Sequence, residues 1–118
     1  MNKKLHFSSP LVNLVLSGRK TVTWRLWDDK DLKADDMVNL LESGTEKNFA
    51  VIKVTKVSEK KMGELTKLDK EGHEDFKSDN EMYRIYSNYY KREVTPDTLV
   101  KIVHFKLVNF NEEGEIKD

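Results

Sequence analysis

The spacing of apolar positions along the chain predicts two helices. From Ser8 to Gly18 the chain has a Ser cap, a proline in the first turn and apolar residues three and four positions apart, which indicates a short helix that ends at glycine. Residues 78–90 repeat the helical spacing, and Ser78 and Glu81 occupy the places of a capping box. These two segments are the helices that we expect to cover a sheet.

Alternation of apolar and polar residues predicts four strands. Residues 20–26 place Val22, Trp24 and Leu26 on one side of a strand and Thr21, Thr23 and Arg25 on the other. Residues 37–43 and 48–58 are separated by a turn at Gly44 and are expected to pair antiparallel. Residues 99–110 predict a long final strand, whereas the polar segment 60–77 predicts only one or two helical turns and a loop around Gly72.

The order of these elements predicts the fold class. A helix, three strands, a helical middle, a helix and a final strand indicate a small α+β domain whose sheet curves strongly enough to close into a barrel. We expect one domain over residues 1–118, with a flexible acidic tail from about residue 110. The natural place for a ligand is a groove where the helices meet the rim of the sheet.

Composition narrows the classes of function. The 118 residues include 21 Lys and Arg against 21 Asp and Glu, so a binder of nucleic acid would need a local basic patch. The chain has no cysteine, which excludes a disulfide-linked partner and thiolate metal sites. No apolar run approaches the length of a spanning helix and no signal peptide is evident, so we expect a cytoplasmic protein without a membrane partner. The oligomeric state is not indicated.

Three cations, Arg19, Lys20 and Arg25, crowd the start of the predicted strand at residues 20–26. Composition alone favours a solvated surface, with Arg19 and Lys20 as cations at the C-terminus of a helix and Arg25 on the wet face. The alternative is that they converge on a cleft. In that case a twist or bulge at the start of the strand would turn the Lys20 amine toward Thr23.

The other candidate residues favour structural roles. Acidic residues surround Gly72 beside His73, but no second histidine lies at ligand spacing, so we predict no metal site. The tyrosines of residues 82–90 fit a buried stripe better than a base-stacking platform. His6 and His104 lie in strand-like runs and read as structural, and of Trp24 and Trp27 one is expected in the core and one at a groove mouth.

The spacing Gly18-x-Lys20-x-x-Thr23-x-Arg25, the later pair Glu71–Gly72, the helix "MYRIYSNYY" and the terminal strand "VKIVHFKLV" together resemble the ASCH domain family of the PUA-like superfamily. The resemblance covers nearly the whole chain. It implies a small mixed β-barrel with flanking helices, a cleft beside the barrel, and binding or processing of RNA.

Thr23 makes the chain similar to a bacterial branch of this family, whose members are amidohydrolases that remove the acetyl group from acetylcytidine. The resemblance implies a catalytic set of Lys20, Thr23 and Glu71, with Glu74 as the alternative acid, and no metal or other cofactor. Lysine would act as base toward the threonine hydroxyl, and the glutamate would hold the lysine or protonate the departing amine. Substrate would be bound by four further residues: Arg19, Thr21, Trp24 and Arg25.

Two other functions remain open from the sequence. A non-catalytic RNA-binding module would use the same cleft, with Arg19, Lys20 and Arg25 on phosphates or base edges. A metal-assisted ribonuclease would use Glu71 and Glu74 to recruit a divalent ion. The zero net charge favours a small substrate, so a nucleoside is preferred over a long RNA as the partner.

Overall fold

A computed structural model describes residues 2–27, 30–73 and 75–108, and the structural statements below refer to these residues. The acidic tail expected from about residue 110, and Glu74, lie outside the described residues.

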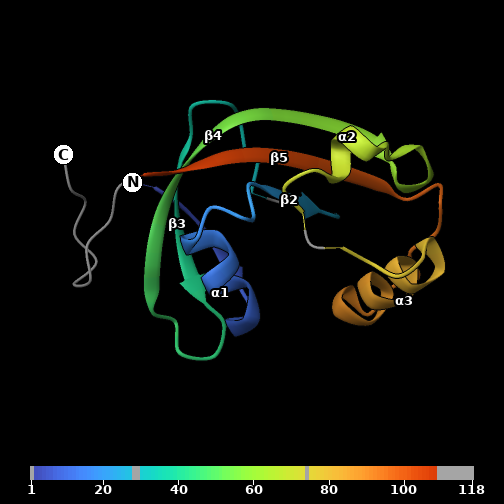
Figure 1. Ribbon diagram of the computed structural model, residues 1–118, viewed down its shortest axis with the longest axis horizontal. Coiled ribbons are helices and arrows are strands. Elements are labelled where there is room, and N and C mark those ends of the chain that lie inside the picture. Colours follow the sequence, from blue (N-terminus) through green and yellow to red (C-terminus); the bar gives the residue numbers. More distant parts are fainter. Residues whose placement is uncertain (1, 28–29, 74, 109–118) are drawn as a thin grey trace.

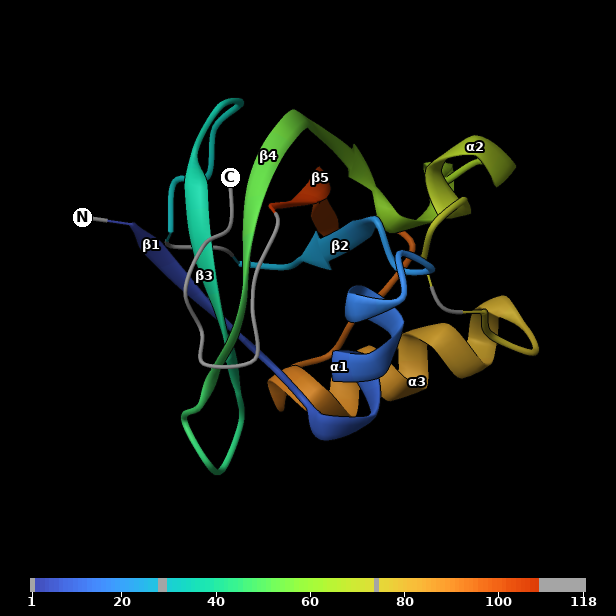
Figure 2. The same ribbon diagram turned by 60° about the vertical axis from the view of Figure 1, so that its left-hand side comes forward.

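Within the described residues the strands form one curled, mixed sheet (Figures 1 and 2). Its strands are β1 (Lys3–Phe7), β2 (Val22–Arg25), β3 (Met37–Glu42), β4 (Asn48–Lys61) and β5 (Leu99–Val108), in the spatial order β1-β3-β4-β5-β2. β1 pairs parallel with β3, and the remaining pairs are antiparallel. The sheet curves into part of a barrel with helices beside it, which confirms the predicted α+β fold class.

Both predicted helices are confirmed, as α1 (Ser9–Leu16) and α3 (Asp79–Tyr90). The Ser78 hydroxyl accepts a hydrogen bond from the Glu81 backbone N–H at 3.1 Å, so the N-terminal cap of α3 forms as predicted. The second bond of the capping box differs, because the Glu81 carboxylate accepts from the backbone N–H of Lys77 instead. The polar middle forms a 3₁₀ turn, η1 (Met62–Glu64), and a four-residue helix, α2 (Lys67–Lys70).

The predicted order of elements lacked β1, although His6 was placed in a strand-like run. The segment is short and carries only two inward apolar residues, Leu5 and Phe7, both of which are buried. Pairing with β3 stabilises it, and that long-range contact is not visible in a local pattern. β1 matters for function because Phe7, at its end, lies beside the start of α1 and helps to line a cavity.

The core consists of two hydrophobic clusters that share the long strand β5. The first cluster packs α1 against β1, β3, β4 and β5, with Leu5, Leu40, Ile52 and Phe105 among its members. The second packs α3 and η1 against β2 and β5, with Trp24, Leu26, Met82 and Ile102 among its members. Because both clusters use β5, their junction lies along the sheet beside β2.

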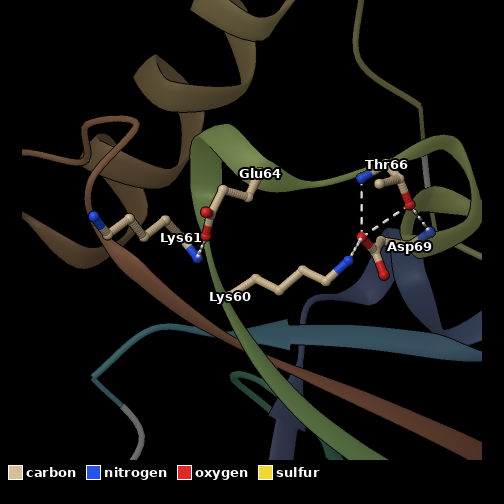
Figure 3. A network of polar contacts seen from close by, with 5 residues as sticks. All are labelled: Lys60, Lys61, Glu64, Thr66 and Asp69. Atoms are coloured by element: carbon tan, nitrogen blue, oxygen red, sulfur yellow. Dashed lines mark hydrogen bonds and ion pairs between the residues drawn. The ribbon is translucent and has the colours of Figure 1, made fainter.

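The connection from β4 to α2 is held by charge-assisted hydrogen bonds (Figure 3). The Asp69 carboxylate accepts from the Lys60 amine at 2.7 Å, from the Thr66 backbone N–H at 2.9 Å and from the Thr66 hydroxyl at 3.0 Å. Burial alone would raise the pKa of Asp69, but these hydrogen bonds outweigh it and hold the pKa below its usual value. A helix of four residues cannot persist on propensity alone, so this network fixes α2 and the Glu71–Gly72 turn that follows it.

Candidate functional site

A cavity of about 250 Å³ lies where the two hydrophobic clusters meet. Four segments contribute its walls: the end of β1 with the start of α1, the β2 strand with the residue Lys20 before it, the loop after Gly72, and the exposed side of α3. The volume is slightly below the roughly 300–1,000 Å³ of drug-sized sites, so the cavity suits a small ligand. Aromatic walls with a few polar groups are typical of such sites.

Lys20 reaches this cavity because of the way α1 ends. Gly18 has a left-handed φ of +78°, and the backbone N–H groups of Arg19 and Lys20 both donate to the Leu14 carbonyl. The turn carries the Lys20 side chain inward, where it is only 3% exposed and its Nζ donates to the Val22 carbonyl at 2.8 Å. The expectation of a solvated surface charge is therefore wrong for Lys20.

Thr23 and Arg25 come to the cavity from β2, which has β5 as its one partner and forms an edge of the described sheet. Because an edge strand leaves one side open, residues from both of its faces line the same cavity, namely Thr23 and Arg25 from one face and Trp24 from the other. Thr23 is 5% exposed. The Arg25 Nε is buried and has no hydrogen-bond partner among the described residues.

Stacked rings form one wall of the cavity. The His73 ring lies 3.8 Å from the Trp24 ring, centroid to centroid, at an interplanar angle of 17°. His73 Nε2 and the Tyr86 hydroxyl are hydrogen bonded at 3.1 Å, and the Tyr90 hydroxyl accepts from the Leu26 backbone N–H. Tyr83, Tyr86 and Tyr90 pack against the second cluster, as predicted, whereas Tyr89 is 61% exposed. Tyr86, Tyr89 and Tyr90 also line the cavity.

The two tryptophans divide as expected. Trp24 is buried at 2% exposure within the second cluster. Trp27 is 40% exposed and lines a neighbouring cavity.

Of the two histidines that were predicted to be structural, His6 lines the first cavity, and its Nε2 lies 2.7 Å from the Glu46 carboxylate.

The structure does not bring every predicted site residue together. Arg19 is exposed, outside the residues that line the cavity, and its Nε donates to the Ser17 hydroxyl. Glu71 and Thr21 are also exposed and line a separate cavity beside His104. In that cavity burial is the largest cause that lowers the pKa of His104, followed by the charge of Lys56. Lys20, Thr23, Trp24 and Arg25 line one cavity, and Glu71 lies at another.

Gly72, which follows Glu71, has a structural role at the start of β2. Its carbonyl accepts from the backbone N–H groups of Thr21 at 2.8 Å and Val22 at 3.3 Å, which anchors the start of β2. Its φ is +78°, and a Cβ placed on it would lie 2.0 Å from the Thr21 Oγ1. Any other residue would have to adopt this left-handed φ and displace the Thr21 hydroxyl, so glycine is favoured here and its carbonyl holds the start of the strand that carries Thr23.

His73 is the cavity residue that sequence reasoning missed. As a lone histidine without a second one near in sequence it did not indicate a metal site, and its stacking on Trp24 joins segments about 50 positions apart. The sequence feature that could have indicated His73 is its position directly after Gly72, in a loop that must return to the sheet. Phe76 also lines the cavity and packs on the second cluster, and it was not predicted either.

Among the described residues, no group of three or more His, Asp or Glu side chains is arranged to hold a metal ion. No helix in the described part of the chain is long and apolar enough to span a membrane.

The curled mixed sheet with a cavity at its β2 edge defines a small α+β domain of the PUA-like type. The sequence model of the ASCH domain matches residues 2–109, and the chain belongs to the ASCH domain family.

Solved structures share this fold. A protein of Enterococcus faecalis V583 is 25% identical, with a TM-score of 0.75 over 92% of this chain and 77% of its own. An ASCH domain from Lactobacillus crispatus is 18% identical, with a TM-score of 0.69 over 89% of this chain and 78% of its own. ASCH from Zymomonas mobilis is 10% identical, with a TM-score of 0.61 over 90% of this chain and 69% of its own. No curated protein matches the chain in sequence.

Proposed function

We propose that the cavity binds a nucleoside, free or within RNA, and that Lys20 and Thr23 hydrolyse an acetyl amide on its base. The observation that carries this proposal is a buried lysine in the same small cavity as a buried threonine. Lysine is almost never fully buried in a folded protein, and a buried titratable group that lines a ligand cavity is a candidate for a chemical role.

The proposed reaction has two steps. In the first, the Thr23 Oγ attacks the acetyl carbonyl carbon while the neutral Lys20 amine takes the hydroxyl proton. The carbon–nitrogen bond breaks, and the cytidine amine leaves with that proton. In the second, Lys20 activates a water that attacks the acetyl-threonine ester, which releases acetate and restores the hydroxyl.

The aromatic wall supports a planar base as the ligand. Trp24, His73 and Tyr86 present stacked rings at one side of the cavity, and stacking on such surfaces is worth roughly 1–3 kcal/mol per base. Arg25 adds a buried Nε donor that a ribose or phosphate oxygen can satisfy. The same features support RNA binding without catalysis, which is the second candidate function.

The first test is release of cytidine from acetylcytidine by the purified protein, with and without a chelator. We expect turnover that chelation leaves unchanged, and a loss of about 10²-fold or more in Thr23→Ala. Thr45→Ala, at an exposed turn, is the matched control and should retain full activity. If the folded protein binds cytidine but does not turn over acetylcytidine, hydrolysis is rejected and RNA binding without catalysis becomes the favoured function.

Glu71→Gln tests the acid that the resemblance implies. Because Glu71 is exposed and lines a different cavity from Lys20 and Thr23, we expect this change to lower kcat less than tenfold. The measurement is kcat with acetylcytidine, alongside a thermal melt to confirm folding. A loss as large as that of Thr23→Ala would show that Glu71 moves to the reacting groups during turnover.

A further inference from the structure

Arg25 lines two cavities. Besides the first cavity, it lines a second of about 370 Å³ together with Trp27, Glu59, Thr98, Leu99 and Lys101. The two cavities therefore adjoin at the Arg25 side chain, and no function has so far been assigned to the second. A ligand held in the first cavity that extends past Arg25 would enter the second.

Charges of the same sign face each other at this junction. Arg25 on β2 is the register partner of Lys101 on β5, and Lys101 is in turn the partner of Glu59 on β4. Directly opposed residues project from the same face of a sheet, and like charges in such a pair are destabilising. Glu59 stands on the other side of Lys101, so the row places two cations and one carboxylate at the wall of the second cavity.

A further cation lies against Trp27, one of the residues that line the second cavity. The Arg92 guanidinium carbon lies 4.0 Å from the centroid of the exposed Trp27 ring, and the edge of Trp27 meets the Tyr90 ring at 5.5 Å between centroids. Tyr90 lines the first cavity and Trp27 the second, so this aromatic pair spans both. Stacking on Trp27 holds the Arg92 guanidinium in place at low entropic cost.

We propose that the second cavity is a phosphate subsite, so that the ligand is a nucleotide whose base lies in the first cavity and whose phosphate binds Arg25, Lys101 and Arg92. This inference rests on the proposed function, because it takes the occupant of the first cavity to be a nucleoside. A phosphate at the junction would accept from the Arg25 guanidinium, whose Nε has no hydrogen-bond partner among the described residues, and would lie beside Lys101. Both a nucleoside monophosphate and an internucleotide phosphate of RNA supply this group.

The test measures affinity by calorimetry at fixed ionic strength, with cytidine, its 5′- and 3′-monophosphates and a cytidine-containing dinucleotide as the probes. We expect at least one phosphate-bearing probe to bind about tenfold more tightly than cytidine, as for a hydrogen bond to a charged group. A gain with a monophosphate identifies a terminal phosphate as the ligand. A gain with the dinucleotide alone identifies an internucleotide phosphate.

Arg92→Gln and Lys101→Gln should each remove most of that gain and leave the affinity for cytidine unchanged. Arg84→Gln, an exposed arginine of α3 that lines neither cavity, is the matched control and should keep the gain. Equal affinity for cytidine and every phosphate-bearing probe would overturn the phosphate subsite and leave the proposed function standing. Failure of all the probes, cytidine included, to bind would overturn both.

Discussion

Lys20→Ala should lower turnover of acetylcytidine by about 10³-fold while the affinity for cytidine changes only a few-fold. The size of the loss follows from removal of a general base, which contributes roughly 10²–10⁴-fold. Binding should survive because the stacking surface of Trp24 and His73 and the Arg25 side chain remain in the cavity. The measurement is kcat by product release, with cytidine affinity by calorimetry.

Truncation of a buried lysine also removes packing, so the result needs a second variant. Lys20→Met keeps most of the apolar stem near the Phe7 ring and removes the amine, and it should lose as much activity as Lys20→Ala with a smaller fall in melting temperature. Lys106→Ala, an exposed lysine on β5, is the charge control and should be fully active. Retained turnover in folded Lys20→Met would remove Lys20 from the catalytic set.

Local patterns predicted the elements whose stability is largely local. The cap at Ser78 and the apolar stripe of α3 are encoded within a few residues, and β3, β4 and β5 are rich in alternating apolar residues. β1 was missed because its five residues become a strand only when they pair with β3, whose first partner, Val38, lies 35 positions from Lys3. Such non-local pairing overrides local propensity.

The site was predictable to the extent that one continuous segment builds it. Lys20, Thr23, Trp24 and Arg25 all lie within six positions, so the short motif that contains them also places them at one cavity. Lys20 is buried, against the prediction from composition, because the turn at Gly18 directs it inward and a count of charges carries no such geometry. The positions of His73 and Glu71 were harder to predict from the sequence, because residues on the two sides of Gly72 line different cavities.

Gly72→Ala should destabilise the protein by about 3 kcal/mol, the largest effect that we expect from a single methyl group. Two costs combine: a left-handed φ of +78°, and a Cβ at 2.0 Å from the Thr21 Oγ1. In a chain of 118 residues this corresponds to a fall in melting temperature of about 10 °C or more. Gly44→Ala is the matched control, because Gly44 has a φ of +95° with no atom within 4 Å of the added Cβ, and it should cost only about 1 kcal/mol.

A double-mutant cycle separates the two costs. Thr21→Ala removes the hydroxyl that the new Cβ would meet and leaves the Thr21 Cβ position at 3.3 Å, a separation that small shifts can accommodate. Thr21→Ala combined with Gly72→Ala should therefore recover about half of the lost stability, whereas Thr21→Ala combined with Gly44→Ala should be additive. The measurement is the free energy of unfolding in urea. If Gly72→Ala costs no more than Gly44→Ala, the contact between the Gly72 loop and the start of β2 does not hold this strand in place.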